Sequence, residues 1–97
     1  MSTQDEPAQR YDLRFLPAAR RAISHRLPEP VATAVLEFCE QALAVNPHRV
    51  GTPLFGTLDG CHGARRGTYR VVYCINGHAR MVSILDIDHR ANVYRPQ

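Results

Sequence analysis

Residues 61–87 decide the fold, and they read CHGARRGTYRVVYCINGHARMVSILDI. Residues 69–75 are a run of β-branched and aromatic residues, and 79–87 form a second, largely apolar run. Asn76-Gly77 between them is the strongest short signal for a two-residue hairpin. Gly67-Thr68 is a weaker turn that joins an earlier strand to the first of these runs. The stretch therefore predicts a three-strand antiparallel meander.

The residues before this meander predict one strand and two helices. Apolar and polar residues alternate over 11–15, which is the period of a half-buried strand. Apolar residues then recur every three to four positions over 17–27 and over 31–45, and Pro28-Glu29-Pro30 separates the two helices. Because so few residues join them, the helices should pack side by side as a hairpin. Residues 51–60, rich in glycine and proline, are predicted as an irregular loop.

These elements predict an α+β fold, in which an N-terminal α-helical hairpin packs on one face of a small antiparallel β-sheet. A chain of 97 residues, 44% hydrophobic and 22% charged, suits one globular domain and excludes a second core. Residues 1–10 are polar and are expected to form a flexible tail, so that the domain spans 11–97.

The composition also bears on location. No stretch approaches the ~18 consecutive apolar residues of a membrane span, and acidic residues precede the first apolar run, so we expect no anchor or export signal. Cys39, Cys61 and Cys74 are an odd count at irregular spacing, which suits reduced thiols. We therefore expect a cytoplasmic protein without membrane contact.

Positive charge is concentrated in one part of the chain. The net charge is +3, and every one of the 12 Lys+Arg residues is arginine. Between residues 48 and 70 a single acid, Asp59, stands against four arginines, Arg49, Arg65, Arg66 and Arg70. Such clustering favours a polyanionic partner, and a solvated face that keeps the protein in solution is the alternative.

Two of these arginines should face each other. If Gly67-Thr68 is a tight turn, Arg65 lies directly opposite Arg70 on one face of the sheet, while Tyr69 and Tyr73 point to the other face and join the core. Like charges in this position destabilise a sheet by a few tenths to ~1 kcal/mol, so an anion is expected to complete the site. Since guanidinium groups match phosphate oxygens bidentately, we interpret the pair as a phosphate site.

The neighbours of the arginine pair depend on register. A two-residue turn at Asn76-Gly77 would place Ser83 next to Arg70, and Gly63 would leave open backbone on the same face. A slipped register, or an acid such as Asp86 paired with one of the arginines, is the alternative.

The C-terminal segment 88–95 carries an imidazole, two guanidinium groups and a phenol, from His89, Arg90, Arg95 and Tyr94. An imidazole with a pKa near 6.5 can exchange a proton at neutral pH, whereas arginine stays cationic. The segment is either a proton-transfer element or a polar C-terminal edge.

Four pieces of the sequence, taken in order, resemble the RelE branch of the RelE/ParE toxin superfamily. They are NPHRVGTPL at 46–54, LDG at 58–60, GTYRVVY at 67–73, and His89-Arg90 followed by VYR at 93–95. The resemblance covers roughly residues 11 to 95. It implies the fold of that family, a small antiparallel sheet that carries an N-terminal helical hairpin.

The resemblance also implies an activity. Such a toxin is a ribosome-dependent endoribonuclease that cuts messenger RNA in the ribosomal A site, with contacts to ribosomal RNA, and a co-expressed RelB-like antitoxin silences it. The implied reaction needs no metal or cofactor. A ribose 2′-hydroxyl attacks the adjacent phosphate and leaves a cyclic phosphate and a 5′-hydroxyl.

Site residues carry over position by position. Arg70 matches the arginine of the Tyr-Arg strand, assigned to phosphate or transition-state charge, and Arg65 matches a basic position on the preceding strand. Where such toxins can carry two lysines, this chain has Gly63 and Arg65. Tyr94 or His89 would then transfer protons, with His62 in reserve. The predicted catalytic residues are Arg65, Arg70, His89, Arg90 and Tyr94, and the predicted RNA- or phosphate-binding residues are Arg49, His62, Arg65, Arg66, Arg70 and Ser83.

Three alternatives remain at the level of sequence. A ParE-like toxin directed at DNA gyrase would share the fold without needing the basic and phenolic C-terminal segment. A catalytically inactive relative would bind RNA without cutting it. A metal or redox module would use Cys61, His62, Cys74 and His78, although their spacing matches no compact zinc pattern.

Overall fold

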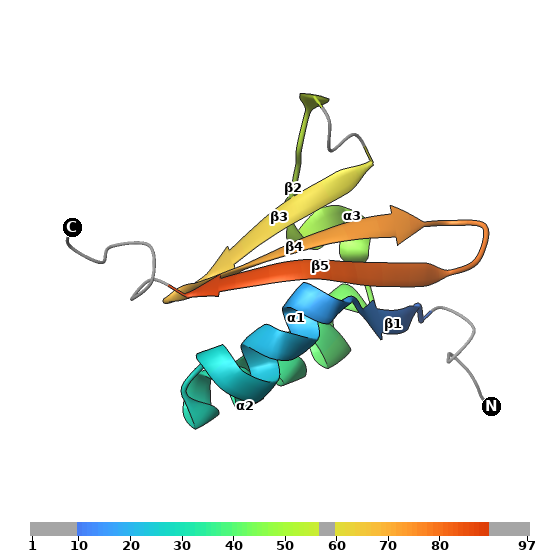
Figure 1. The fold of residues 1–97 in the computed structure, drawn as a ribbon. Helices are drawn as coiled ribbons and strands as arrows, with labels where there is room; N and C mark the ends of the chain where they lie inside the picture. The colour runs from blue at the N-terminus through green and yellow to red at the C-terminus, as the bar shows by residue number, and fades with distance from the viewer. Residues whose placement is uncertain (1–9, 57–59, 90–97) are drawn as a thin grey trace.

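The computed structural model describes residues 10–56 and 60–89, so most of the predicted tail 1–10 lies outside the described residues. One sheet of five strands has the order β1-β5-β4-β3-β2. The strands are β1 (Asp12–Phe15), β2 (Thr52–Pro53), β3 (Cys61–Arg66), β4 (Tyr69–Asn76) and β5 (Met81–His89). The helices are α1 (Pro17–Arg21), α2 (Glu29–Phe38) and α3 (Pro47–Val50). Figure 1 shows α1 and α2 together on one side of the sheet.

The predicted α+β fold is confirmed, but the sheet differs from the prediction in two ways. Thr52–Pro53, which falls in the predicted irregular loop 51–60, forms β2 and pairs with β3, and the pairing of β1 is parallel. β3, β4 and β5 form the predicted antiparallel meander, whereas β1 pairs with β5 in parallel. After β1 the chain passes through the two helices, β2, β3 and β4 before β5 pairs with β1. β1 and β5 run in the same direction. The sheet is therefore mixed, and β1 occupies the edge next to the longest strand.

Prolines define where the helices begin. Pro17 is the first residue of α1, and Pro30 lies in the first turn of α2, where a missing backbone N–H breaks no intrahelical hydrogen bond. α2 therefore starts at Glu29, before the predicted position. Each of these helices continues as a π-helical segment, Ala22–Arg26 after α1 and Cys39–Leu43 after α2. The two resulting rods form the predicted hairpin.

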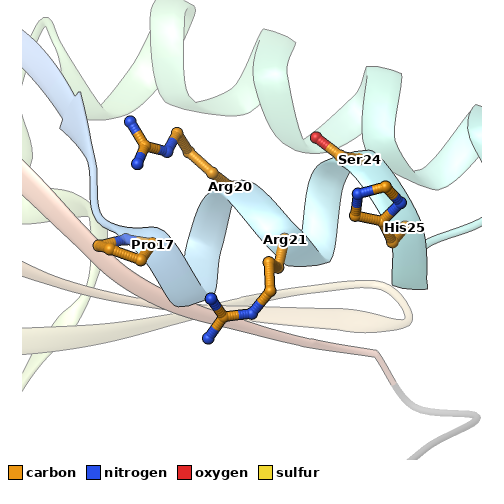
Figure 2. A pocket seen from close by; sticks show the side chains of 5 residues that line it. All are labelled: Pro17, Arg20, Arg21, Ser24 and His25. Atoms are coloured by element: carbon orange, nitrogen blue, oxygen red, sulfur yellow. The ribbon is translucent and has the colours of Figure 1, made fainter.

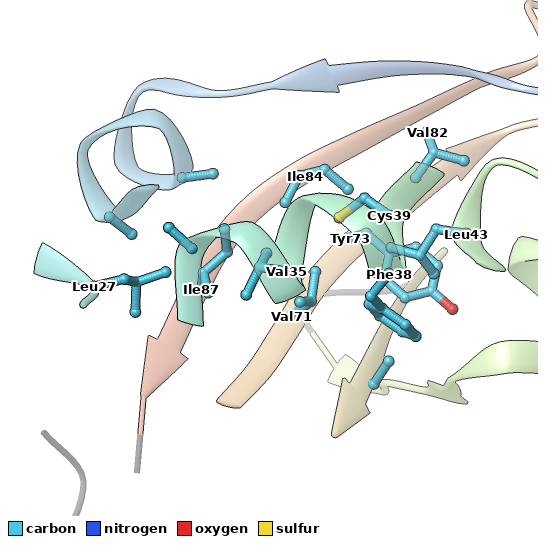
Figure 3. Close-up of a cluster of buried hydrophobic side chains, with 14 residues drawn as sticks. Leu27, Val35, Phe38, Cys39, Leu43, Val71, Tyr73, Val82, Ile84 and Ile87 are labelled. Atoms are coloured by element: carbon cyan, nitrogen blue, oxygen red, sulfur yellow. The ribbon is translucent and has the colours of Figure 1, made fainter. Parts of the chain in front are cut away.

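The core lies between the helical rods and the sheet (Figure 3). Apolar side chains from both layers are fully buried there, among them Ala19, Ala22, Val35, Cys39, Leu43, Val71, Tyr73, Val82 and Ile84. Tyr69 packs against this cluster, which confirms that Tyr69 and Tyr73 point toward the core. We call this side of the sheet the helix-covered face, and the opposite side, which carries Gly63, Arg65, Arg70 and Val72, the open face.

The β3–β4 turn has the predicted geometry. Gly67 has a φ of +54°, the left-handed region that the first central position of a type II′ turn requires. Arg66 pairs with Tyr69 and Arg65 with Arg70 on either side of it.

The predicted two-residue turn at Asn76-Gly77 is wrong. Asn76 pairs with Met81, so four residues form the turn. The Asn76 side chain accepts a hydrogen bond from the Ala79 backbone N–H at 3.1 Å, and Arg80 takes a φ of 51°. This side-chain hydrogen bond favours the longer turn.

The register of β5 changes as a result. The four-residue turn shifts β5 along β4, so Ser83 lies opposite Cys74 and not next to Arg70. A bulge between the Tyr73 and Val72 pairs adds one more residue to β5 and shifts the positions that follow it. The residue opposite Arg70 is Asp88.

The cysteines differ from the expectation of three reduced thiols. Cys61 and Cys74 are direct partners across β3 and β4, and the structure joins them as a disulfide. Cys39 is a free, buried thiol, and burial raises its pKa to about 12. Within residues 10–56 and 60–89, no group of three or more His, Cys, Asp or Glu side chains is arranged to hold a metal ion. None of the helices described has the length and apolar character needed to cross a membrane.

Candidate phosphate site on the open face of the sheet

Arg65 and Arg70 lie directly opposite each other on the open face, as predicted. The tight turn at Gly67 fixes this pairing, because a slip of one residue would send one of the two side chains to the helix-covered face. Both residues are exposed. Side chains of directly opposed residues start only about 4.5–5.5 Å apart at Cβ, so the two guanidinium groups can reach the same anion.

Asp88 completes a row of three charged residues across β3, β4 and β5. Arg70 Nη2 lies 3.9 Å from Asp88 Oδ2, and the two side chains are 49% and 39% exposed. An exposed ion pair at this distance contributes about 0–1 kcal/mol, which is too little to fix either side chain. An intramolecular acid therefore does pair with Arg70, as the alternative anticipated, but it is Asp88 and not Asp86. Two positive charges and one negative charge leave the row with a net charge of +1.

Asp86 pairs with Arg26 and not with either arginine of the pair. Its Oδ1 accepts a hydrogen bond from Arg26 Nη2 at 3.3 Å and another from the Ile87 backbone N–H at 2.8 Å. Arg26 comes from the end of the first helical rod. Neutralisation by Arg26 reduces the negative charge that Asp86 adds near the arginine pair, so the open face stays favourable for an anion.

Gly63 provides space next to the pair. It lies opposite Val72, two residues before Arg65 and therefore on the same face. Among the described residues, a Cβ at this position would contact only the Leu54 side chain, at 3.7 Å. The prediction of open backbone beside the arginines is thus confirmed, with Leu54 as one wall that the sequence did not indicate.

Several predicted site residues lie on the helix-covered face. His62 pairs with Tyr73 and stacks on its ring at a centroid distance of 5.4 Å. Arg66 lies over the Phe38 ring, with 4.9 Å from its Cζ to the ring centroid. His89 pairs with Tyr69, which also belongs to that side. The structure does not bring these residues together with the arginine pair.

The environment of His62 disfavours its charged form. Its Nδ1 is buried and has no hydrogen-bond partner within the described part of the chain. Burial lowers the pKa of His62, and the neighbouring His48 lowers it further. A histidine held neutral and stacked on Tyr73 is therefore part of the packing around α3.

The remaining predicted residues are dispersed. Arg49 is exposed on α3, and the first residue of that helix, Pro47, accepts a hydrogen bond from the buried Tyr73 hydroxyl at 2.7 Å. Arg49 thus belongs to a helix on the helix-covered face. Ser83 lies beside Cys74, several residues along β5 from Asp88. Arg90 and Tyr94 lie outside the described residues.

Comparisons with known proteins agree with this fold. Residues 13–94 match the family described as ParE toxin of type II toxin-antitoxin system, parDE. Toxin RelG of Mycobacterium tuberculosis is 47% identical over 85 residues, which cover 88% of this chain and 97% of that protein. Toxin RelE of the same organism is 50% identical over 70 residues, 72% of each chain.

Solved structures support the same assignment. The toxin–antitoxin complex RelBE2 of Mycobacterium tuberculosis contains a chain with a TM-score of 0.81 and 45% identity, covering 90% of this chain and 99% of that one. The isolated RelE toxin of E. coli has a TM-score of 0.67 at 18% identity over 87% of this chain and 90% of its own, which shows the shared fold. This chain therefore belongs to the ParE toxin family of type II toxin–antitoxin systems, as a RelE-type member of the RelE/ParE superfamily.

Proposed function

We propose that this RelE-type toxin is a ribosome-dependent endoribonuclease that cuts messenger RNA in the A site and thereby inhibits translation. The observation that carries the proposal is the Arg65–Arg70 pair, two exposed cations on opposite positions of β3 and β4 whose one ion pair within residues 10–56 and 60–89 is the weak, partly exposed contact of Arg70 with Asp88. Such a pair costs stability in the isolated toxin and is offset when an anion binds between the guanidinium groups. A phosphate of the RNA backbone is the anion that suits this geometry.

The reaction is a transesterification within the RNA. The ribose 2′-oxygen attacks the adjacent phosphorus and loses its proton to a base, while the bond to the 5′-oxygen breaks and that oxygen gains a proton from an acid. The products are a 2′,3′-cyclic phosphate and a 5′-hydroxyl. Negative charge builds up on the phosphoryl oxygens in the transition state, and Arg65 and Arg70 are placed to stabilise it.

Proton transfer requires groups other than these arginines, because a guanidinium stays protonated at neutral pH. The family resemblance matches Arg90 and Tyr94 to the arginine and tyrosine of the C-terminal segment, with Arg90 as a third cation. The proton carrier is then Tyr94 or His89, since the imidazole of His89 can exchange a proton at neutral pH. His89 stands at the end of β5, on the side of Tyr69. If it transfers a proton, replacing it with alanine will reduce cleavage between pH 6 and 8, and unchanged cleavage will leave Tyr94 as the candidate.

The proposed setting is the cytoplasm, with ribosomes carrying messenger RNA as the target and a RelB-like antitoxin as the inhibitor. The solved relatives include the RelBE2 complex and the archaeal RelE-RelB complex from Pyrococcus horikoshii, which is 26% identical to this chain. An acidic antitoxin segment that folds onto the toxin would neutralise its basic surface. The reaction needs no cofactor.

The test is induced expression followed by mapping of messenger RNA 5′ ends. The intact toxin should create new 5′ ends inside translated codons, and Arg70→Ala should abolish them. Arg10→Ala is the matched control. Arg10 is an exposed arginine that precedes β1, and its guanidinium donates a hydrogen bond to the Glu40 backbone carbonyl oxygen. Loss of gyrase supercoiling without new 5′ ends would favour a ParE-like target, and ribosome binding without new ends would indicate an inactive relative.

A further inference from the structure

Cys61 and Cys74 place sulfur chemistry on the open face of the sheet. They are direct partners across β3 and β4, and the structure joins them as a disulfide. Cys61 lies two residues before Gly63, so strand alternation puts it on the face that also carries the arginine pair. Neither cysteine belongs to the hydrophobic cluster that the described residues form between the helical rods and the sheet. The proposed function uses neither of them.

The two cysteines occupy a position of the strand ladder that suits a disulfide between neighbouring strands. The Ile75 backbone N–H donates a hydrogen bond to the Gly60 carbonyl oxygen at 3.4 Å, so the next pair, Cys61–Cys74, is a non-hydrogen-bonded pair. Opposed side chains come closest together at such pairs. The dithiol and the disulfide therefore both fit the same strand register.

The two sulfur atoms differ in their access to solvent. Cys61 is only 6% exposed, whereas Cys74 is partly buried. Ser83 lies opposite Cys74 on β5, and Arg14 lies opposite Ser83 on β1. Both neighbours of Arg14 in β1 pack against the core, so strand alternation puts Arg14 on the open face. A hydroxyl and a cation on the same face favour the thiolate of Cys74, which is the sulfur that a small reagent reaches first.

The disulfide lies where a weakly held edge joins the sheet. β2 has only two residues, both exposed, and one of them pairs with Gly63. Leu54 follows β2, and its backbone N–H donates a hydrogen bond to the Cys61 carbonyl oxygen at 2.9 Å. The Leu54 side chain is the wall of the space beside Gly63. A short edge strand with few contacts belongs to the least stable part of a fold, so a covalent link at Cys61 adds order to this wall.

We propose that Cys61 and Cys74 form a reversible thiol–disulfide site, oxidised by low-molecular-weight disulfides and reduced by the corresponding thiols, and that the disulfide orders the Leu54 wall beside the arginine pair. The effect on RNA cleavage rests on the proposed function, whereas the redox chemistry does not. Disulfides in the cytoplasm, which is the proposed setting, are usually transient and catalytic or redox-sensing. Oxidising conditions therefore favour cleavage.

Oxidation takes two exchange steps. The Cys74 thiolate attacks one sulfur of the small disulfide, which forms a mixed disulfide and releases one small thiolate. The Cys61 thiolate then attacks the Cys74 sulfur, which closes the Cys61–Cys74 bond and releases the second small thiolate. Two electrons pass from the cysteine sulfurs to the small disulfide, and the released thiolates take up the two protons that the cysteines lose.

Equilibration with glutathione tests the redox site. The folded toxin is incubated with mixtures from fully oxidised to fully reduced glutathione, alkylated, and analysed by intact mass spectrometry. We expect no added alkyl group at the oxidised end, two at the reduced end, and the same curve in both directions. Cys39 should stay unlabelled, because it is fully buried and burial raises its pKa to about 12. A disulfide that stays closed in reduced glutathione, or cysteines that stay reduced in oxidised glutathione, would overturn the proposal.

Single variants test the order of attack. Cys61→Ser keeps the accessible sulfur, so oxidised glutathione should add one glutathione to it, whereas Cys74→Ser should react more slowly. The control is Ser24→Cys in the background of Cys61→Ser/Cys74→Ser. Ser24 is exposed and lines a shallow hollow on the outer side of the first helical rod (Figure 2), so a thiol there should form the mixed disulfide without closing an internal one. If Cys74→Ser reacted as fast as Cys61→Ser, the assigned order would be wrong.

Amide hydrogen exchange tests the effect on the Leu54 wall. Reduction should speed the exchange of the Leu54 and Ile75 amides by up to about 100-fold, the factor that corresponds to a cross-link closing a loop of this length. The control is the Asp12 amide at the opposite edge of the sheet, which donates to the Arg80 carbonyl oxygen at 2.8 Å and should exchange at the same rate in both forms. Equal exchange of Leu54 in the two forms would overturn the ordering effect.

Single-turnover cleavage of ribosome-bound messenger RNA tests the link to function. The reduced toxin should need a several-fold higher ribosome concentration for its half-maximal rate, with the maximal rate retained. Cys61→Ser/Cys74→Ser should behave like the reduced wild type under both conditions. Equal cleavage by the two forms would overturn the link. Absence of cleavage in both forms would refute the proposed function alone, because the mass and exchange measurements do not depend on it.

Discussion

Replacing Arg65 with glutamine should stabilise the isolated toxin while impairing its action on RNA. Arg65 faces Arg70 across the strands, and only Arg70 has a carboxylate within 4.0 Å among the described residues, that of Asp88. Like charges directly opposite each other cost about 0.2–1 kcal/mol. Asp88 offsets little of this cost, because at 3.9 Å and with side chains 39% and 49% exposed the ion pair is largely screened by water.

The expected gain can be measured as a shift in the unfolding temperature. In a domain of this size 1 kcal/mol corresponds to about 4–8 °C, so Arg65→Gln should raise Tm by about 1–8 °C at low salt. The Debye length falls from about 10 Å at 0.1 M to about 3 Å at 1 M, so the gain should shrink as salt is added. Circular dichroism at about 20 mM and about 1 M NaCl provides both values.

The control for this experiment is Arg49→Gln, which removes the same charge from an exposed residue of α3. It should show no comparable gain that depends on salt. If Arg65→Gln lowers Tm, or if its gain persists at 1 M NaCl, the two arginines do not repel each other in the folded toxin. Repulsion would then no longer explain why an anion should bind between them, and the reasoning would be refuted.

Three further predictions concern stability and need only thermal unfolding. Gly51→Ala should destabilise the fold by about 1–3 kcal/mol, because its Cβ would lie 2.7 Å from the buried Tyr73 hydroxyl and 2.8 Å from a backbone carbonyl oxygen. A reducing agent should lower the free energy of unfolding of the wild type by up to about 3 kcal/mol, and its Tm with it, because the Cys61–Cys74 disulfide closes a loop with a sequence separation of 13. The Cys61→Ser/Cys74→Ser variant should show no change in Tm when the reducing agent is added. His62 has a lowered pKa in the folded state, so its contribution is fully present above the unfolded-state value of about 6.5 and is lost as the pH falls from there through the folded pKa; His62→Phe should flatten that part of the stability curve, and an unchanged curve would contradict the assignment.

Local sequence patterns were sufficient for most of the fold. The apolar periodicity of the helices and the alternation within β4 depend on burial of one side of each element, so they could be predicted from the residues themselves. The turn at Gly67 was predictable because glycine adopts its positive φ without strain. The same turn placed Arg65 opposite Arg70, which is why the pairing of these two residues was correctly predicted.

Features that depend on contacts distant in sequence were not predictable. The parallel pairing of β1 with β5 joins segments about 70 residues apart, and nothing in the local pattern of β1 specifies its partner. The four-residue turn depends on the hydrogen bond from the Ala79 N–H to the Asn76 side chain, which competes with the tight turn that Asn-Gly usually forms. The longer turn moved Ser83 away from the site, and the bulge that follows Ser83 in β5 brought Asp88 opposite Arg70.

For two of the predicted site residues, the sequence alone could have shown that they lie on the other face of the sheet from the arginine pair. His62 and Arg66 are three positions and one position away from Arg65, so strand alternation alone sends their side chains to the opposite face. Asp88 could not have been found in this way, because its place beside Arg70 follows from the shifted register of β5. The alternation of side chains thus predicts which residues of one strand share a face, whereas predicting the neighbours on the next strand requires the geometry of the turn.

The most direct test of the central claim is a double-mutant cycle on cleavage of ribosome-bound messenger RNA. Arg65→Gln, Arg70→Gln and the double variant are compared with the wild type in single-turnover reactions with purified ribosomes. If one phosphate lies between the two guanidinium groups, each single variant should lose cleavage strongly, and the double variant should lose much less than the product of the two separate losses. Losses that multiply, or single variants that cleave like the wild type, would show that the two arginines do not act on one phosphate.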